Sequence, residues 1–299
     1  MEQPSSYRSG FVAVVGRPNV GKSTLVNALV GDKVAITSDK PQTTRSAIRG
    51  VLTTDALQVV FVDTPGYHKP KTLLGQRLND LVRAAWSGVD LALFVVDAAA
   101  GVGRGDARVA QDLAAVGAPS FCVVNKIDAC KRDEIAAALA QAASFGDHAE
   151  FIPVSARTGE QVDKLRDLVM TRMPAGPLFY PPGMTTDQPP PVFVAELVRE
   201  KLLSTARDEL PHSIAVVTDE YVERDDGILE IHAVIYVERD SQKGIVIGKG
   251  GSTLKRAGTE TREELEILFG RKVYLELRVK VEKEWQRRPH ALERLGFGI

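Results

Sequence analysis

The hydrophobic residues in the first part of the chain come in short uninterrupted runs that are separated by helical patterns. The five runs lie at residues 11–15, 57–62, 91–96, 121–124 and 151–154. Consecutive apolar positions are typical of strands that are covered on both faces, as in a parallel sheet with helices on each side. We therefore predict an α/β domain with a mostly parallel sheet over residues 1–175.

One pair of segments indicates a different connection. Residues 47–53 are followed closely by residues 56–63, and only a tight turn fits between them. Such a pair must be antiparallel, because parallel neighbours need a long crossover. The predicted sheet is therefore mixed.

A proline-rich segment marks the end of this domain. Seven of the eighteen residues from 174 to 191 are proline, which fixes φ and removes backbone donors too often for a helix or a central strand. Proline-rich segments favour extended conformations. We predict a semi-rigid linker over residues 176–191.

The pattern changes after the linker. A helical pattern at 192–206 is followed by alternating runs at 213–222 and 228–237, a helical pattern at 252–269 and a strand pattern at 272–281. Strands and helices do not alternate here, which favours a small α+β domain over residues 192–299.

Composition and charge narrow the class of protein. The chain has 38 Lys and Arg against 39 Asp and Glu, so its net charge of -1 gives no global attraction to nucleic acid or to an anionic membrane. Locally the charges separate: residues 192–242 hold 5 basic and 12 acidic side chains, whereas residues 243–288 hold 12 basic and 7 acidic ones. With two cysteines, no signal-peptide pattern in residues 1–10 and no apolar stretch long enough to span a bilayer, a cytoplasmic protein is expected.

The first apolar run leads into the sequence GRPNVGKS at 16–23 and then into a helical pattern. In this context backbone N–H groups and a helix N-terminus face phosphate groups, Lys22 meets the β- and γ-oxygens, and Ser23 ligates Mg²⁺. The alternative is a chance glycine-rich turn. The predicted nucleotide contacts are Gly16, Arg17, Pro18, Asn19, Val20, Gly21, Lys22, Ser23 and Thr24.

A second motif, D-T-P-G at 63–66, ends the run at 57–62. The Asp63 carboxylate can hold Mg²⁺ through water there, and the Gly66 N–H can sense a γ-phosphate. The alternative is a solvated turn at a strand end. Thr64 and Pro65 are assigned to the same nucleotide site.

A third motif, N-K-I-D at 125–128, follows the run at 121–124. Guanine offers two neighbouring donors, N1–H and the 2-amino group, that one carboxylate can accept, whereas adenine has an acceptor at N1 and no 2-amino group. We predict that Asp128 selects guanine, that Lys126 covers the base and that Asn125 ties this loop to the phosphate loop. A helix cap by Asp128 is the alternative.

A short segment after the run at 151–154 completes the predicted guanine site. Ser155 and Ala156 belong to it, and the Ala156 N–H can meet guanine O6. The four motifs, in this order and each at a strand end, are the signature of a translation-factor-type GTPase. We therefore expect GTP or GDP with Mg²⁺ as the bound nucleotide.

The loop between Asp32 and Ser46 is expected to supply a further Mg²⁺ ligand. Its P-Q-T-T-R sequence at 41–45 contains two candidate hydroxyl groups. We favour Thr44 over Thr43, and both could instead be ordinary loop residues. The predicted metal ligands are thus Ser23, Thr44 and Asp63.

The residue after Gly66 bears on the rate of hydrolysis. Many GTPases place a glutamine there to orient the attacking water, and Tyr67 has no carboxamide. We expect slow intrinsic hydrolysis, on the order of 10⁻⁴ s⁻¹. Asn19 could help hold a monovalent cation against the phosphates or could stabilise its own loop. The predicted catalytic residues are Lys22, Thr44, Gly66 and Asn19.

A second glycine cluster lies in the basic part of the chain. The sequence G-K-G-G at 248–251 follows an expected apolar anchor, Ile245 and Ile247, and precedes the helical pattern at 252–269. A K-homology RNA module needs this arrangement, because glycines let the backbone approach single-stranded RNA and the lysine meets a phosphate. The alternative is a solvated basic helix face. The predicted RNA contacts are Ile247, Gly248, Lys249, Gly250, Gly251, Lys255 and Arg256.

From residue 11 to residue 297 the chain resembles the Era family of ribosome-associated GTPases. The resemblance rests on the motifs at 16–23, 41–45, 63–66, 125–128 and 246–251 and on their combination with a C-terminal K-homology domain. It implies a type II K-homology fold, binding near the 3′ end of 16S rRNA and a role in maturation of the 30S subunit. It also implies a K⁺ site at Asn19 and peripheral association with the inner face of the cell membrane. The family lacks the usual glutamine after the Gly of the D-T-P-G motif, and Tyr67 at this position fits that pattern.

These observations lead to one hypothesis and two alternatives. The hypothesis is a monomeric GTPase whose nucleotide state gates RNA binding in 30S assembly. The alternatives are a GTPase of tRNA modification or signalling with a protein-docking C-terminal half, and a metabolic phosphotransferase. RNA binding by residues 192–299 distinguishes the first alternative, and competition between ATP and GTP distinguishes the second.

Overall fold

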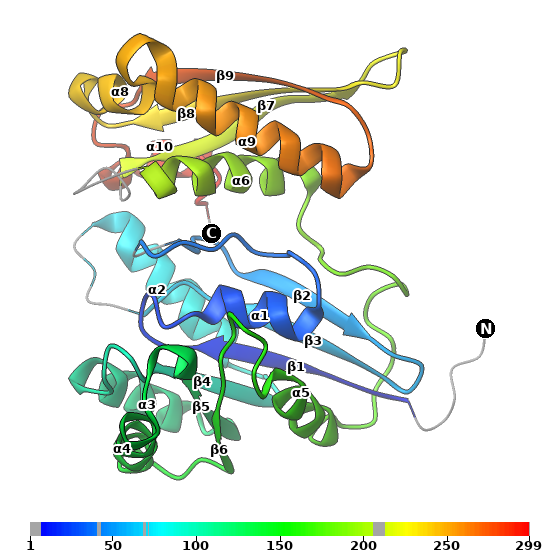
Figure 1. Ribbon diagram of the computed structural model, residues 1–299, viewed down its shortest axis with the longest axis vertical. Helices are drawn as coiled ribbons and strands as arrows, with labels where there is room; N and C mark the ends of the chain where they lie inside the picture. The colour runs from blue at the N-terminus through cyan, green and yellow to red at the C-terminus, as the bar shows by residue number, and fades with distance from the viewer. Residues whose placement is uncertain (1–6, 41–42, 68–69, 71, 206–212, 299) are drawn as a thin grey trace. The chain divides into compact units, whose positions relative to one another are not determined.

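The computed structural model describes residues 7–40, 43–67, 70, 72–205 and 213–298 (Figure 1). The chain divides into two compact units, and the main division falls between Asp187 and Gln188.

The first unit is built around a six-stranded sheet. Its strands are β1 (Arg8–Val15), β2 (Ile48–Thr53), β3 (Leu57–Asp63), β4 (Leu91–Asp97), β5 (Ser120–Asn125) and β6 (Glu150–Pro153), in the spatial order β2-β3-β1-β4-β5-β6. The β2–β3 pair is antiparallel and the other pairs are parallel. The predicted mixed, mostly parallel sheet is confirmed.

Helices cover both faces of this sheet (Figure 1). The bounds are α1 (Lys22–Val30), α2 (Leu73–Trp86), α3 (Arg104–Val116), α4 (Arg132–Ala143) and α5 (Val162–Thr171). One hydrophobic core lies under α1 and α5, and a second lies under α2, α3 and α4. In β1, Val12 and Val14 face the first core while Ala13 and Val15 face the second. The consecutive apolar residues of each strand therefore serve two cores.

The parallel arrangement brings the predicted nucleotide motifs together. The carboxyl ends of β1, β3, β5 and β6 meet at one edge of the sheet, and each is followed by one of the four motifs. A one-turn helix, η1 (Ile127–Ala129), begins directly after β5. Ligands of open α/β sheets bind at this edge, outside the carboxyl ends of the strands.

The proline-rich segment lies along the opposite side of the sheet from β6. The Val51 N–H of β2 donates to the Thr185 carbonyl oxygen over 2.8 Å, and Gly50 forms an isolated antiparallel bridge with Thr186. The buried Gln58 side chain of β3 donates to the Tyr180 carbonyl oxygen over 2.9 Å. Backbone hydrogen bonds and the Gln58 side chain therefore hold this segment against the edge of the sheet.

The second unit has the element order α-β-β-α-α-β. It comprises α6 (Pro190–Thr205), β7 (Ala215–Glu223), β8 (Leu229–Val237), α8 (Asp240–Ile247), η2 (Lys249–Gly251), α9 (Ser252–Phe269) and β9 (Val273–Val281), followed by η3 (Trp285–Arg287) and α10 (Pro289–Arg294). The sheet order is β7-β8-β9, with β7–β8 antiparallel and β8–β9 parallel. The predicted α+β class is confirmed.

One face of this small sheet forms a core with α6, α8 and α9. Ile235 and Val237 of β8 pack there with Val198 of α6 and Ala257 of α9. Because side chains alternate along a strand, His232 and Tyr236 point to the other face. There the Arg294 guanidinium of α10 lies 5.8 Å from the centre of the Tyr236 ring.

Helix α8 is an element that the sequence analysis did not predict. The Gln242 side chain accepts hydrogen bonds from the backbone N–H groups of Glu238 (2.9 Å) and Arg239 (3.0 Å) and so caps its start. Since the segment is helical, Val246 faces the core and is 1% exposed, whereas Ile245 is 56% exposed. The expectation that Ile245 forms an apolar anchor is therefore wrong, and Val246 takes that position.

Candidate functional site

The predicted phosphate loop connects β1 to α1 and passes close to its neighbours. A Cβ atom on Gly16 would lie 2.4 Å from the Val95 carbonyl oxygen, and one on Gly21 would lie 2.3 Å from Asn125 Nδ2. Gly21 also has a φ of 93°, which favours glycine. No acidic residue stands in the first turn of α1, so its positive N-terminal end faces the loop without a competing carboxylate on that turn.

Lys22 is buried at the base of this loop. Its Nζ donates to the Arg17 carbonyl oxygen over 2.9 Å. Burial lowers the pKa of the Lys22 ammonium to about 8, although the nearby Asp63 carboxylate acts in the opposite direction. A buried cation beside a loop of backbone N–H groups suits a polyanionic ligand, because phosphate oxygens would replace the hydration that the ammonium lacks.

The three predicted metal ligands lie together. Ser23 Oγ is 2.8 Å from Thr44 Oγ1, and Asp63 Oδ2 accepts hydrogen bonds from Ser23 (2.6 Å) and Thr44 (3.2 Å). The Thr43 hydroxyl donates instead to the Lys40 carbonyl oxygen over 2.6 Å. Of the two candidate threonines, the structure brings only Thr44 to the cluster.

The chemistry of this cluster fits Mg²⁺. Its donors are two hydroxyl oxygens and a carboxylate, the hard oxygen ligands that Mg²⁺ takes. The other carboxylate oxygen, Asp63 Oδ1, is buried and has no hydrogen-bond partner among the described residues. Burial raises the pKa of Asp63, while Lys22 and the hydroxyl groups of Ser23 and Thr44 oppose this shift. A divalent cation with its water shell would satisfy this carboxylate.

The segment after β3 touches the phosphate loop through Gly66. A Cβ atom at this position would lie 2.6 Å from Pro18 Cα and 2.7 Å from Pro18 N, so only glycine fits. Thr64 Oγ1 donates to the Val14 carbonyl oxygen over 2.9 Å. Tyr67 is buried beside Trp86, and its hydroxyl accepts a hydrogen bond from Arg83 over 3.0 Å. Its side chain therefore belongs to the core under α2.

Asn125 connects three of the motifs. Its Nδ2 donates to the Val20 carbonyl oxygen over 2.8 Å, which is the predicted tie to the phosphate loop. Its Oδ1 accepts a hydrogen bond from the Ala156 N–H over 3.0 Å. The donor that the sequence analysis directs at guanine O6 thus has a partner inside the protein, and its contact with guanine stays a prediction.

Lys126 crosses to the phosphate loop as well. Its Nζ donates to the Asn19 carbonyl oxygen and pairs with Asp97 Oδ2, both over 2.6 Å. Asp97 was not among the predicted site residues. It is the last residue of β4, and a polar residue at the carboxyl end of a parallel strand is the signal that could have identified it.

Asp128 stands on η1 with its carboxylate held by the loop after β6. Ser155 Oγ donates to Oδ1 over 2.6 Å, and the Arg157 guanidinium pairs with Oδ2. The hydrogen bond from Ser155 and the positive charge of Arg157 lower the pKa of Asp128. The carboxylate is therefore ionised at neutral pH, as acceptance of two guanine donors requires. Arg157 was not among the predicted site residues.

The second candidate site is the loop between α8 and α9. Gly248 has a φ of 76°, and a Cβ atom there would lie 2.3 Å from Thr253 Oγ1 and 2.9 Å from the Thr253 backbone N. Gly250 and Gly251 also have positive φ values but have open space around them. Lys249, Lys255 and Arg256 are exposed, and Ile247 is half-buried.

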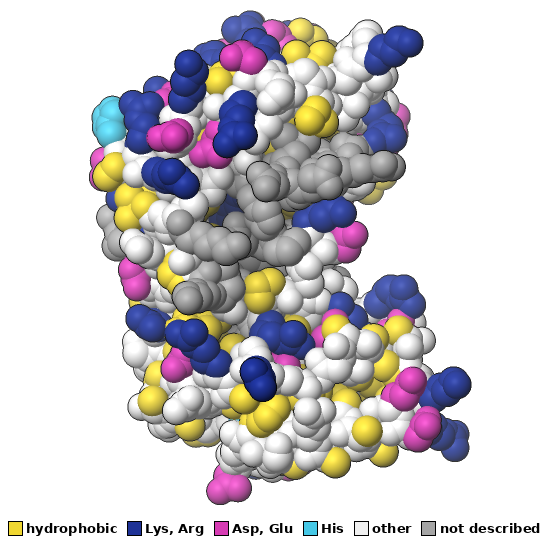
Figure 2. All heavy atoms as spheres, turned by 90° about the vertical axis from the view of Figure 1, so that its left-hand side faces the viewer, with side chains coloured by type: hydrophobic (Ala, Val, Ile, Leu, Met, Phe, Trp, Pro, Cys, Tyr) yellow, Lys and Arg dark blue, Asp and Glu magenta, His cyan; other side chains and the backbone are white. Residues whose placement is uncertain are grey.

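The surroundings of this loop are rich in basic side chains. Figure 2 views the side on which α8 and the start of α9 lie, and many Lys and Arg side chains are spread over the C-terminal unit there. Open space at Gly250 and Gly251, together with neighbouring cations, allows a polyanionic backbone to approach closely. All predicted RNA contacts lie in this loop, at the end of α8 or in the first two turns of α9.

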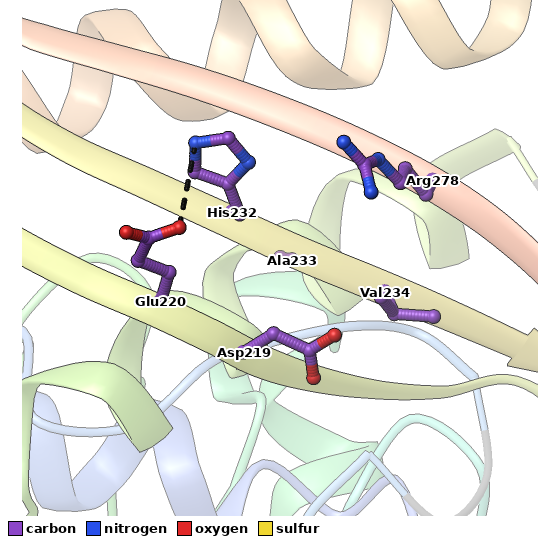
Figure 3. Close-up of a pocket in the computed structure, with 6 residues that line it drawn as sticks. All are labelled: Asp219, Glu220, His232, Ala233, Val234 and Arg278. Carbon is purple, nitrogen blue, oxygen red and sulfur yellow. Dashed lines mark ion pairs between the residues drawn. The ribbon is translucent and has the colours of Figure 1, made fainter.

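A pocket of about 570 Å³ lies elsewhere on the C-terminal unit, over its three strands. It is lined by Asp219, Glu220, His232, Ala233, Val234 and Arg278, and Figure 3 shows that they come from β7, β8 and β9. His232 Nε2 is 2.9 Å from Glu230 Oε1, and His232 Nδ1 is 3.3 Å from Glu276 Oε2. The hydrogen bond with Glu230 and the charges of Glu276 and Glu220 raise the pKa of His232.

Among the described residues, no three His, Cys, Asp or Glu side chains form a cluster suited to a metal ion. Within the same residues, none of the helices is both long and apolar enough to cross a membrane.

Family models match both units of the chain. Residues 11–126 match the model described as 50S ribosome-binding GTPase, and residues 209–286 match the KH domain model.

Similar proteins cover the whole chain. It is 54% identical over 298 residues to GTPase Era of Mycobacterium sp. (strain KMS), and 52% identical over 298 residues to GTPase Era of Mycolicibacterium smegmatis. Each of these comparisons covers 98% of this chain and 100% of the relative.

Two solved structures are similar over the same length. One is Era in complex with MgGDPNP and nucleotides 1506–1542 of 16S ribosomal RNA, with a TM-score of 0.94. The other is a variant of Aquifex aeolicus Era bound to GDP and AlF4⁻, with a TM-score of 0.93. Both are 37% identical to this chain, and the comparisons cover 98% of it and 100% of the solved chains.

Proposed function

Because the chain belongs to the Era family of GTPases, we propose that it is a nucleotide-gated RNA-binding switch in the assembly of the small ribosomal subunit. The chain hydrolyses GTP, and membership in this family removes the phosphotransferase alternative.

The nucleotide site is proposed to work through three groups of residues. The backbone of residues 16–23 and the Lys22 ammonium bind the phosphates. Ser23, Thr44 and Asp63 hold Mg²⁺, directly or through water, and the metal neutralises charge on the phosphate oxygens. Asp128 accepts the guanine donors, while Asn125 and Lys126 keep its loop against the phosphate loop. The distances among these residues support this division of roles.

One observation supports the proposed nucleotide-dependent switch. Segments before β2 and after β3 both reach the nucleotide loop, Thr44 by its 2.8 Å contact with Ser23 and Gly66 by its fit against Pro18. A γ-phosphate and its Mg²⁺ would bind both segments, and hydrolysis would release both. Tyr67 packs in the core and has no carboxamide to orient water, so intrinsic hydrolysis is expected to be slow.

The proposed RNA partner is the 3′-end region of 16S rRNA. Support comes from the glycine loop at 248–251, its exposed cations and the similar Era structure that holds nucleotides 1506–1542 of that RNA. A role in 30S maturation follows from this partner. K⁺ binding beside Asn19, a monomeric state and peripheral membrane association stay predictions that rest on the family resemblance.

The test measures binding of the full-length protein to an RNA with the sequence of the last forty nucleotides of 16S rRNA. Fluorescence anisotropy is read with GDP and with the GTP analogue GDPNP. The affinity should differ between the two nucleotides and should fall as salt rises. Equal affinity in both states would remove the proposed gating.

A double variant tests the loop itself. The double substitution Lys249→Asp with Gly250→Asp should abolish RNA binding and leave GTP hydrolysis almost intact. The control is Lys272→Asp, which reverses an exposed charge beyond the far end of α9, a helix of 18 residues and so about 27 Å long. Loss of affinity in the control but not in the double variant would assign RNA binding to another surface.

A further inference from the structure

The carboxylate of Asp128 has two protein donors, one on each oxygen. Ser155 Oγ donates to Oδ1 over 2.6 Å, and the Arg157 guanidinium pairs with Oδ2. The Asp128 side chain is 11% exposed, whereas that of Arg157 is 77% exposed. Arg157 therefore reaches the carboxylate from the solvent side, and Ser155 reaches it from the inside.

Both donors leave acceptor capacity for a base. Each oxygen of an ionised carboxylate has about two lone-pair sites, so the group can accept about four hydrogen bonds. Ser155 and Arg157 use one site on each oxygen, and one site on each remains. Guanine presents two parallel donors, and both are satisfied only if the plane of the carboxylate is held in one orientation.

A single inner donor does not hold that plane. With Ser155 alone, the Asp128 carboxylate can still rotate about its Cβ–Cγ bond and turn Oδ2 away from the base. One N–H group of the Arg157 guanidinium donates to Oδ2, and a charge-assisted hydrogen bond on this second oxygen restrains the rotation. The positive charge beside the site also favours the ionised form of Asp128.

We propose that Arg157 is a specificity-determining positioning residue of the guanine site, which fixes Oδ2 of Asp128 so that the carboxylate accepts both guanine donors. This inference rests on the proposed role of Asp128 as the residue that selects the base. Arg157 acts through Asp128, and its effect is on the choice of base and not on the phosphate end of the nucleotide.

The effect should be largest on the second of the two base contacts. Hypoxanthine, the base of inosine, lacks the 2-amino group of guanine and needs only one carboxylate oxygen. A poorly oriented Asp128 therefore loses affinity for GDP while its affinity for inosine diphosphate (IDP) changes little. A general disturbance of the fold would weaken the binding of both nucleotides equally. The ratio of the two dissociation constants therefore distinguishes a change in the orientation of Asp128 from a change in the fold.

The experiment measures dissociation constants of GDP and IDP for the full-length protein by calorimetry at low salt. Arg157→Ala should raise the GDP constant about two- to fivefold, as for an exposed ion pair, and should lower the GDP preference over IDP by the same factor. Arg157→Lys keeps a cation and should restore most of the preference. Arg132→Ala removes an equal charge from the start of α4 and should change neither constant.

The outcomes distinguish a failure of the positioning role of Arg157 from a failure of the proposed role of Asp128. If Asp128→Asn keeps the guanine preference, Asp128 does not select the base and the proposed site is wrong. If Asp128→Asn loses the preference but Arg157→Ala keeps it, or binds GDP more tightly than the unmodified protein, Arg157 does not position the carboxylate and the inference is overturned.

Discussion

Asn125 donates from its side-chain amide to the carbonyl oxygen of Val20 over 2.8 Å, across 105 positions of sequence. The same side chain accepts the Ala156 N–H through its other end. One buried residue therefore joins the loops that follow β1, β5 and β6. This side chain therefore connects the loop predicted to bind the phosphates with the loops predicted to bind the base.

Replacing this residue should weaken both the fold and the nucleotide site. Asn125→Ala leaves the Val20 carbonyl and the Ala156 N–H without partners at a position that is 2% exposed. Each unsatisfied buried group costs about 1–3 kcal/mol. We expect a loss of about 2–4 kcal/mol in the free energy of unfolding, measured by urea denaturation, together with weaker GDP binding. A loss below about 0.5 kcal/mol, the size of an ordinary surface substitution, would contradict this role.

The two adjacent threonines offer a matched pair. Thr44→Ala removes a hydroxyl from the cluster with Ser23 and Asp63, and it should lower Mg²⁺-dependent GTP hydrolysis by about 10- to 100-fold, the range for groups that hold or support a metal. Thr43→Ala removes a hydroxyl that donates to the Lys40 carbonyl oxygen and should leave the Mg²⁺ dependence unchanged. Titration of single-turnover rates with Mg²⁺ measures both. The reverse order of effects would assign the ligand to Thr43.

The glycines of the second loop should respond differently to alanine. Gly248 and Gly250 both have positive φ values, so alanine at either costs about 1–2 kcal/mol of backbone strain. Only at Gly248 would the Cβ atom also strike the Thr253 backbone, at 2.9 Å from its N atom. Gly248→Ala should therefore reduce RNA affinity more than Gly250→Ala does. Equal losses in an anisotropy titration would show that backbone strain alone determines the effect.

The His232 cluster should make the stability of the C-terminal unit depend on pH. The folded pKa of His232 is raised above the ordinary value of 6.5, so the protonated side chain stabilises the fold. This stabilisation is fully present below about pH 6.5 and is lost as the pH rises through the higher folded pKa. NMR titration of the ring protons measures the shift.

A variant of one neighbouring carboxylate tests the cause of this shift. Glu276→Gln removes a negative charge 3.3 Å from Nδ1 and should lower the pKa of His232. His148, whose pKa is lowered by burial in the first unit, serves as an internal reference and should not move. An unchanged His232 titration would mean that Glu276 does not contribute.

Much of the first unit could be predicted because its signals are local. Apolar runs that serve two cores indicate parallel strands, and the chain places its four nucleotide motifs directly at the ends of β1, β3, β5 and β6. Because each motif follows a strand, the sequence predicted that the motifs lie together at the carboxyl ends of the strands. The choice between Thr43 and Thr44 could not be made from spacing, since it depends on which hydroxyl the loop turns toward Asp63.

What escaped prediction depends on contacts between distant positions. Arg157 reaches Asp128 from the next motif along the chain, and nothing in either segment alone indicates the pair. Helix α8 has only eight residues and contains Gly244, so its apolar residues predicted an anchor before the glycine loop and not a helix. Its cap uses Gln242 to accept from the Glu238 and Arg239 N–H groups, a signal too short to outweigh the run of Ile, Val and Ile that follows.

The position of the segment around Thr185 and Thr186 affects how copies of the chain behave toward one another. Strand β2 is the last strand on its side of the sheet, and an open outer strand is a template for pairing with another molecule. Hydrogen bonds with residues 180–187 occupy polar groups of β2 and β3 at this edge of the sheet. The prolines of the segment have no N–H group, so they cannot donate to a further strand. Shortening this segment would therefore expose a surface that favours aggregation, even in a molecule whose nucleotide site is intact.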